Sequence, residues 1–261
     1  MQIRKIPLIQ LQNLDPTSTR QFVEELECNG FAILTTNGYT EQDVILRTLT
    51  NSQGMKTFRF PSHSEKIQYS EDQRQSFKTL FKWGRLCLQA LLREIDPDGV
   101  KSQDLLQTLH RSEQMSNLFP PNGLGHTPFP DGVEFSGSFF NIFHYDYGLL
   151  NHHQDRYLVT VVAVNLQPSS ENKTALWVQS PSAGWVNVDA HLQSGEIAIF
   201  TGEDFEAVST ALGRPLKAVV HCTRVDPTTE RLVCYDNQPD PSTSPSGNRV
   251  SMAFVLSEAA D

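Results

Sequence analysis

Two stretches of the chain each place a histidine two positions before an aspartate: His144 with Asp146, and His153 with Asp155. On a β-strand, side chains at positions i and i+2 point to the same face, so either pair can aim an imidazole and a carboxylate at one point. A third donor is His221, which lies in an apolar, β-branched run typical of a strand. Two imidazoles and one carboxylate suit non-haem Fe(II), with positions left open for a co-substrate and oxygen.

The composition limits which partners and compartments the chain fits. Its 261 residues carry a formal net charge of −9 and no basic stripe, so nucleic acid is not expected as a partner. No apolar run approaches the roughly 18 residues needed to cross a bilayer, and the first residues do not resemble a signal peptide. The cysteines Cys28, Cys87, Cys222 and Cys234 form no CxxC pair, so we expect reduced thiols and a cytoplasmic protein without a membrane partner.

Residues 1–134 are predicted to be mostly helical. A cap at Asp15 and a stop at Gly30 indicate one helix, and an apolar stripe from Leu80 to Leu92 indicates another. The other elements expected in this part are a short edge strand at 5–10, a strand at 31–36, a helix at 40–55, a loop at 61–75 and an irregular crossing at 117–134.

From about residue 135 the pattern changes to short β-type runs separated by turns. Helices first and many strands later predict an α+β protein whose second half, residues 135–261, is a sandwich or jelly roll. No linker separates the halves, so residues 1–261 are expected to form a single domain. The strands are expected at Ser138–Tyr145, Arg156–Val164, Ala175–Val178, Trp185–Val188, Glu196–Phe200, Ala218–Val225, Glu230–Tyr235 and Arg249–Leu256.

Taken in order, these features resemble the Fe(II)- and 2-oxoglutarate-dependent dioxygenases of the isopenicillin N synthase-like superfamily. The order is a His-x-Asp before a strand, strands containing Trp, a Gly-Glu, a His on a strand and an Arg-x-Ser on a last strand. The resemblance covers most of the chain and implies a double-stranded β-helix (jelly-roll) core with the N-terminal helical region packed on it. The stretches that carry it are Ile6–Leu11, Glu25–Leu34, Phe140–Asp146, His153–Thr160, Ala175–Gln179, Gly184–Val188, Gly195–Glu203, Val220–Cys222 and Asn248–Phe254.

The resemblance favours His153, Asp155 and His221 as the metal ligands. The residues after Asp155 form a strand of the kind that follows the family's His-x-Asp, whereas a turn follows Asp146. His144 then lies where the preceding strand ends and is a candidate for the pocket lining. His152 is expected to point the opposite way from its neighbour, behind the ligands or at the surface.

A 2-oxoglutarate molecule needs its far carboxylate bound, and the planar fork of an arginine can do this with two charge-assisted hydrogen bonds. Arg249 fits this role, and the Ser251 hydroxyl, two residues later on the same strand face, can add a third bond. Arg231 is the second choice: it follows His221 at the separation usual in plant-type members, but it lacks the serine. Tyr145 is a further candidate for a hydroxyl on the co-substrate.

The resemblance implies an enzyme that uses Fe(II), 2-oxoglutarate and O2 to hydroxylate, desaturate or cyclise a small molecule, with release of succinate and CO2. No catalytic side chain beyond the metal ligands is predicted. Two alternatives stay open: a jelly-roll binding protein without activity, and a metal-dependent oxidase that does not use 2-oxoglutarate. The long span from Asp155 to His221 is expected to hold extra loops at Pro168–Lys173 and Phe205–Pro215.

Overall fold

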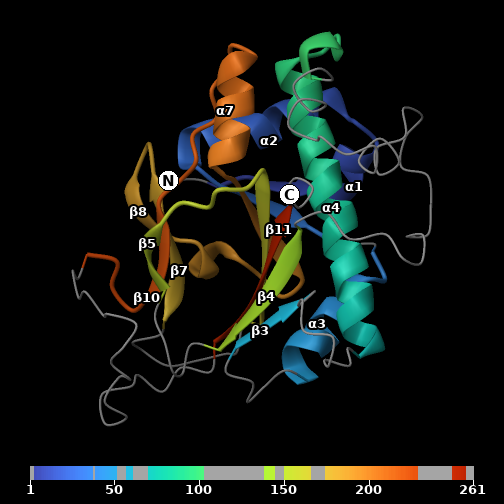
Figure 1. Ribbon diagram of the computed structural model, residues 1–261, viewed down its shortest axis with the longest axis vertical. Helices are drawn as coiled ribbons and strands as arrows, with labels where there is room; N and C mark the ends of the chain where they lie inside the picture. Colours follow the sequence, from blue (N-terminus) through green and yellow to red (C-terminus); the bar gives the residue numbers. More distant parts are fainter. Residues whose placement is uncertain are drawn as a thin grey trace.

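A computed structural model describes residues 3–37, 39–51, 57–60, 70–102, 138–144, 150–165, 174–228 and 249–256. Within these ranges the chain forms two β-sheets, and helices cover the outer face of the larger sheet (Figure 1). The mixture of helices with mainly antiparallel sheets agrees with the α+β class predicted from the sequence. Among the described helices, none is both long and apolar enough to cross a bilayer.

Local capping signals set the ends of helix α2 (Pro16–Asn29). The Asp15 carboxylate accepts a hydrogen bond of 2.8 Å from the Ser18 amide, which satisfies an amide at the start of the helix. The helix ends at Gly30, whose φ of 78° lies in the left-handed region that favours glycine. The helix predicted between these two residues is therefore confirmed.

Helix α4 (Glu71–Ile95) is the longest element of the described chain. It begins with a capping box, in which Ser70 and Gln73 each accept a hydrogen bond from the other's backbone amide. The loop expected at 61–75 is wrong from residue 71 onward, because this capping box starts the helix there. Residues 61–69 lie outside the described residues.

The other N-terminal elements are shorter than the sequence pattern suggests. The edge strand expected at 5–10 is β1 (Lys5–Pro7), and helix α1 (Leu8–Gln12) replaces its second half. The helix expected at 40–55 begins at Gln42 as α3 (Gln42–Asn51), and residues 52–56 lie outside the described residues. Pro7 explains the early end of the strand, because its ring removes the amide hydrogen that a longer ladder would need.

Seven strands form the larger sheet, in the order β1, β2, β9, β6, β11, β4, β3. All neighbours in it are antiparallel except β1 and β2. Three of its strands come from the part of the chain that the sequence indicated as mostly helical, and they lie at the two edges of the sheet. The strands after β1 are β2 (Ala32–Thr35), β3 (Thr57–Phe60), β4 (Phe139–His144), β6 (Val159–Asn165), β9 (Glu196–Thr201) and β11 (Val250–Leu256).

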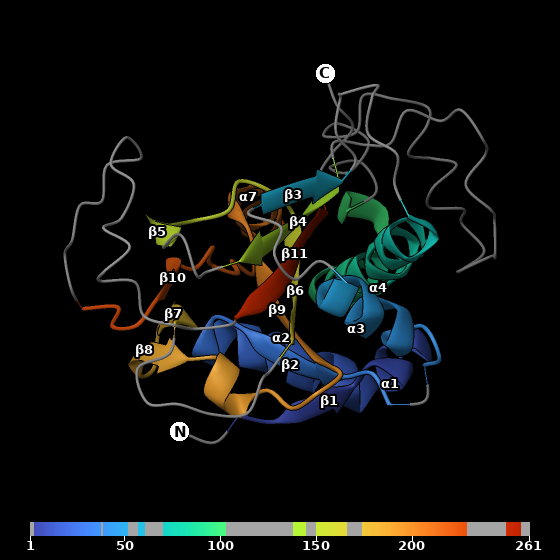
Figure 2. The same cartoon turned by 90° about the horizontal axis from the view of Figure 1, so that it is seen from below.

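Four antiparallel strands form the smaller sheet, in the order β5, β10, β7, β8 (Figure 2). The sequence pattern predicted three of them, whereas it indicated a turn where β5 lies. The crossing at 117–134 and the strand at Glu230–Tyr235 fall outside the described residues. The strands are β5 (Leu150–His153), β7 (Ala175–Ser180), β8 (Gly184–Asn187) and β10 (His221–Arg224).

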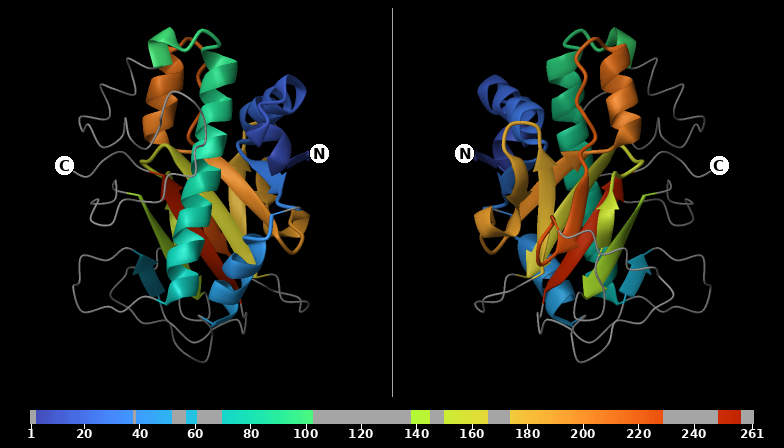
Figure 3. Two further views of the ribbon diagram at one scale, coloured as in Figure 1. Left: turned by 90° about the vertical axis from the view of Figure 1, so that its right-hand side faces the viewer. Right: turned by 90° about the vertical axis from the view of Figure 1, so that its left-hand side faces the viewer.

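The larger sheet is buried on both faces, which explains the near-continuous apolar run of β6. Val161 and Ala163 belong to the core cluster that also contains the buried side of α4. Val162 and Val164 point the other way, into a second cluster shared with the smaller sheet. Helix α4 packs across β6 and β11, as the left panel of Figure 3 shows.

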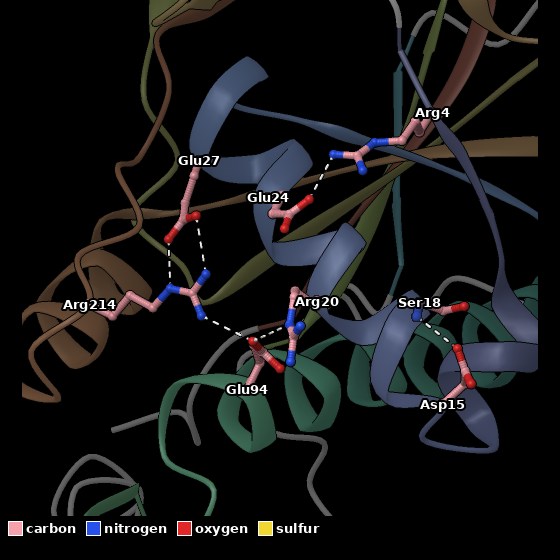
Figure 4. A network of polar contacts seen from close by, with 8 residues as sticks. All are labelled: Arg4, Asp15, Ser18, Arg20, Glu24, Glu27, Glu94 and Arg214. Atoms are coloured by element: carbon pink, nitrogen blue, oxygen red, sulfur yellow. Dashed lines mark hydrogen bonds and ion pairs between the residues drawn. The ribbon is translucent and has the colours of Figure 1, made fainter.

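Helix α7 (Glu203–Ala211) occupies most of the segment that the sequence indicated as a loop, Phe205–Pro215. The expectation of an extended loop there is wrong. Arg214, just after the helix, donates hydrogen bonds to Glu27 of α2, at 2.7 and 3.2 Å, and to Glu94 of α4, at 3.3 Å (Figure 4). This ion-pair network fixes the segment after α7 on the helical layer.

Candidate metal centre

Three of the predicted site residues lie together at one end of the smaller sheet. His153 is the last residue of β5, His221 is the first residue of β10, and these two are directly paired in the sheet. Asp155 follows β5 in the connection to β6. Its Oδ1 atom lies 3.6 Å from Nε2 of His153 and 3.8 Å from Nε2 of His221, and the candidate ligand atoms of all three residues lie within 4.8 Å of one another.

Backbone carbonyls orient both imidazoles. Nδ1 of His153 lies 2.8 Å from the carbonyl oxygen of Asn151, and Nδ1 of His221 lies 3.2 Å from that of Val219. A carbonyl oxygen can only accept, so each Nδ1 must donate, which places the lone pair of the neutral ring on Nε2. Both lone pairs therefore face the Asp155 carboxylate, in the tautomer that a metal ligand needs.

The Asp155 carboxylate is positioned from its own side. Thr160 on β6, which is buried, donates a hydrogen bond of 2.5 Å from its hydroxyl to Oδ2, and this leaves Oδ1 directed at the imidazoles. The Asp155 carbonyl accepts a hydrogen bond of 2.8 Å from the Glu203 amide at the start of α7. The segment that carries the carboxylate is thus held at both its side chain and its backbone.

Gly202 allows this close approach. A Cβ atom at this position would lie 2.0 Å from the Tyr157 carbonyl oxygen and 2.8 Å from that of Asp155, distances that backbone atoms cannot tolerate. The sequence indicated Gly202 only as part of a family-like strand end. Its role in seating the Asp155 segment against α7 depends on contacts between distant parts of the chain.

Burial keeps His221 neutral. Desolvation is the main cause that lowers the pKa of His221, to about 4, and the neighbouring His153 lowers it further, whereas the Asp155 carboxylate opposes the shift. A neutral imidazole is the form that binds a metal ion. With two imidazoles and a carboxylate on one face, the donor set fits a non-haem Fe(II) ion.

The three residues line a cavity of about 310 Å³ between the sheets. Arg249 and Ser251, predicted to bind a co-substrate carboxylate, line it as well: Ser251 lies on β11 of the larger sheet, and Arg249 directly precedes that strand. The sequence did not predict the other lining residues. Most of them are ordinary strand residues, and only the pairing register shows which of their side chains face the cavity. They are Asn141, Phe143, Leu150, Tyr157, Thr160, Val162, Leu176, Phe200, Thr223, Ala253 and Val255.

Arg249 makes a further contact that the sequence did not indicate. Its Nη1 donates a hydrogen bond of 2.9 Å to the Ser251 hydroxyl, as expected of neighbours on one strand face. Its Nε and Nη2 donate to the two carboxylate oxygens of Asp189, at 2.6 and 3.0 Å. Asp189 opens a short 3-10 helix, η1 (Asp189–His191), after β8 of the smaller sheet, so this ion pair connects the two sheets.

Of the remaining candidate residues, the structure describes His152 and His144 but not the other three. His152 is exposed, as expected for the residue beside a ligand; its ring stacks on Trp185 at 4.9 Å between centroids. His144 ends β4, and its pairing partner in β11 is Val250. Tyr145, Asp146 and Arg231 lie outside the described residues, so the choice between Arg249 and Arg231 stays a prediction.

Comparisons with known proteins give a fold-level likeness. No family model matches the chain, and no curated protein matches it. Among solved structures, a full-length Neurospora crassa protein in complex with alpha-KG and 5-formyluracil matches with a TM-score of 0.58 at 10% identity. The match covers 98% of this chain and 84% of the Neurospora crassa protein.

Two further solved structures match over nearly the whole of this chain. The dioxygenase for auxin oxidation in rice has a TM-score of 0.52 at 14% identity, over 98% of this chain and 83% of its own. JOX2, in complex with 2OG, Fe and JA, has a TM-score of 0.53 at 15% identity, over 99% of this chain and 75% of its own. The chain therefore has the fold of the 2OG-Fe(II) oxygenases, and the resemblance seen in the sequence is confirmed at that level.

Proposed function

We propose that the chain is an Fe(II)- and 2-oxoglutarate-dependent oxygenase that acts on a small molecule. The observation that carries the proposal is the placing of two chemical groups in one cavity. His153, Asp155 and His221 offer a three-point metal face, and Arg249 with Ser251 offers a carboxylate-binding pair. The fold shared with 2OG-Fe(II) oxygenases supports the same interpretation.

His153 and His221 would hold iron through Nε2, and Asp155 would hold it through Oδ1. When bound, iron in such a site supplies the redox chemistry that couples decarboxylation of 2-oxoglutarate to oxidation of a C–H bond, giving succinate and CO2 as co-products. The carbonyls of Asn151 and Val219 keep the imidazoles in the ligating tautomer. Thr160 keeps the second oxygen of Asp155 turned away from the metal position.

Arg249 and Ser251 would bind the far carboxylate of 2-oxoglutarate, because a guanidinium beside a hydroxyl offers several donors to it. Between them and the metal face, the wall is mainly apolar, with Phe143, Leu176 and Phe200 among its residues. Such a wall excludes water and orients a small substrate against the reacting centre. The small organic ligands in the Neurospora crassa and JOX2 structures support a substrate of this size class, with hydroxylation as the simplest outcome.

A direct test is an anaerobic titration of the metal-free protein with Fe(II) and then 2-oxoglutarate, followed by the weak visible charge-transfer absorption of the chelate. We expect the band in the wild type and in His152→Ala, and its loss in His153→Ala. A band that survives His153→Ala but is lost in His144→Ala would move the metal to the other His-x-Asp pair. Folded wild type that binds Fe(II) without a band on adding 2-oxoglutarate would contradict the proposal.

One observation favours a second candidate, a metal-dependent oxidase that does not use 2-oxoglutarate. Arg249 already has a carboxylate partner in Asp189, so it does not need a co-substrate to compensate its charge. Substrate oxidation that continues at full rate in 2-oxoglutarate-free buffer would identify this second function.

A further inference from the structure

The ion pair between Arg249 and Asp189 is buried and bidentate. Arg249 is 8% exposed, and the Asp189 side chain is 12% exposed. Both carboxylate oxygens accept hydrogen bonds from the guanidinium, and one of them also accepts a bond of 3.1 Å from the Leu176 amide. The carboxylate is thus fixed by a backbone amide as well as by the arginine.

An incoming carboxylate would have to share the guanidinium with Asp189. The two carboxylates would then lie on the same planar group, at a separation of roughly 5 Å, where like charges repel in a poorly hydrated site. Part of the attraction that Arg249 offers is therefore already used inside the protein. A pocket with an uncompensated arginine would bind a dicarboxylate more tightly than this one does.

The charges around the cavity lead to the same conclusion. Among the described lining residues, only Asp155 and Arg249 carry a formal charge, with both histidines neutral as ligands. Asp189, which does not line the cavity itself, adds a second negative charge through its ion pair with Arg249. With a divalent metal ion bound, the net charge of the site is about +1. This charge balances the single negative charge of a monocarboxylate 2-oxo acid. A dicarboxylate such as 2-oxoglutarate carries one negative charge more than the site can balance.

We propose, on the premise of the function above, that Asp189 determines co-substrate specificity: it weakens the hold of Arg249 on a far carboxylate and so reduces the preference for dicarboxylate over monocarboxylate 2-oxo acids. The acceptable co-substrates then form a wider class, 2-oxo acids whose tail is either a carboxylate or an uncharged chain of similar length. An uncharged chain would instead rest on the apolar lining of the cavity, which includes Phe143, Leu176 and Phe200.

The test compares two 2-oxo acids of similar length, 2-oxoglutarate and the uncharged-tail analogue 2-oxohexanoate. Anaerobic titrations of the Fe(II)-loaded protein give a Kd for each from the chelate absorption, without turnover. The variant is Asp189→Asn, which keeps the shape and removes the charge. Its matched control is Glu25→Gln, because Glu25 is also a buried carboxylate paired with an arginine, Arg4 at 2.8 Å, but lies on α2 and does not line the cavity.

In Asp189→Asn we expect 2-oxoglutarate to bind about tenfold more tightly, while the Kd of 2-oxohexanoate changes by less than about twofold. Glu25→Gln should leave both values as in the wild type. Weaker binding of 2-oxoglutarate by Asp189→Asn, or an equal change for both acids, would overturn the proposal and make Asp189 a purely structural partner of Arg249.

The wild type alone keeps the proposal testable if Asp189→Asn does not fold. We expect the wild type to bind 2-oxoglutarate less than about tenfold more tightly than 2-oxohexanoate. A site whose arginine has no carboxylate partner in the protein would discriminate far more strongly against an acid that lacks the far carboxylate. A preference of about a thousandfold would overturn the inference alone. Fe(II)-loaded protein that binds neither acid would instead contradict the proposed function.

Discussion

The two ends of the cavity are built in different ways. At the metal end, each imidazole is oriented by the carbonyl two residues before it, and Thr160 lies five positions after the carboxylate that it holds. At the other end, Arg249 is held by Asp189, sixty positions earlier in the chain, in the 3-10 helix η1 that follows the smaller sheet. Local contacts orient the metal ligands, whereas the carboxylate-binding arginine depends on how the two sheets meet.

This difference predicts how substitutions at each end should affect the protein. Loss of a ligand side chain at the metal end should have a local effect, because the contacts that orient the ligand side chains come from neighbouring residues in the chain. Damage at the arginine end should spread to the stability of the whole protein, because the ion pair there joins two sheets. The predictions below test this contrast, from the largest expected effect to the smallest.

Replacing a ligand should abolish metal binding with little effect on the fold. In His221→Ala we expect the Kd for Fe(II) to rise by more than about 100-fold, since even residues that only support a ligand contribute 10- to 100-fold. Equilibrium dialysis with metal analysis measures this, and His152→Ala is the matched control, because that residue is exposed, stacks on Trp185 and does not line the cavity. Unchanged metal binding in His221→Ala would remove this histidine from the site.

Breaking the ion pair should destabilise the protein without removing the metal. Arg249→Gln leaves the Asp189 carboxylate buried without its partner, and we expect the free energy of unfolding to fall by about 3 kcal/mol. The double variant with Asp189→Asn should recover more than half of this loss, because no buried charge remains. Urea unfolding of the metal-free proteins gives the values, and a double variant as unstable as the single one would refute the coupling.

A methyl group at residue 202 should disturb both stability and metal binding. In Gly202→Ala the Cβ atom would meet the Tyr157 carbonyl at 2.0 Å, so the backbone must move, at a cost of about 2 kcal/mol. Because the same segment carries Asp155, metal binding should weaken too. Gly99→Ala is the control: its φ of 68° makes alanine unfavourable, but nothing lies within 4 Å, so its metal affinity should not change.

The smallest effect should come from the residue that supports the carboxylate. Thr160→Val removes the hydrogen bond to Asp155 at nearly constant shape, and we expect about tenfold weaker metal binding and a loss of about 1 kcal/mol in stability. Thr48→Val, which removes a buried bond of 2.8 Å to Ser76 remote from the cavity, should cost similar stability and leave metal binding intact. Equal metal affinities in the two variants would show that Thr160 does not position the carboxylate.

The same contrast explains what the sequence could predict. His153, Asp155 and His221 could be predicted because the spacing offered two His-x-Asp pairs and the resemblance to the dioxygenases favoured this one. Most strands of the second half were found from their periodicity. The capping residues around α2 were equally clear. The sequence also led us to expect a double-stranded β-helix core, a single domain and a cytoplasmic location. The comparisons with solved structures test only the first of these, through the shared fold.

The errors in the sequence-based predictions have different physical causes. Asp189 has no local signal, since an aspartate after a strand usually marks only a turn. The start of α4 at residue 71 was missed in a polar stretch whose capping box looks like any Ser-rich loop. Strand β5 was missed because its four residues gain their strand character from pairing with β10. Helix α7 was missed because the segment was interpreted as extra loop length between Asp155 and His221, although Glu203 and Glu206 suit the first turn of a helix.

Strand β1 has one more consequence, for how molecules of this protein meet. It forms one edge of the seven-stranded sheet, yet it is only three residues long and ends at Pro7, which has no amide hydrogen to offer. Lys5 on the same strand forms a 2.7 Å ion pair with Glu196, which places charge along the edge. A short, charged and proline-ended edge gives a strand from another molecule almost nothing to pair with, so this side of the sheet resists aggregation.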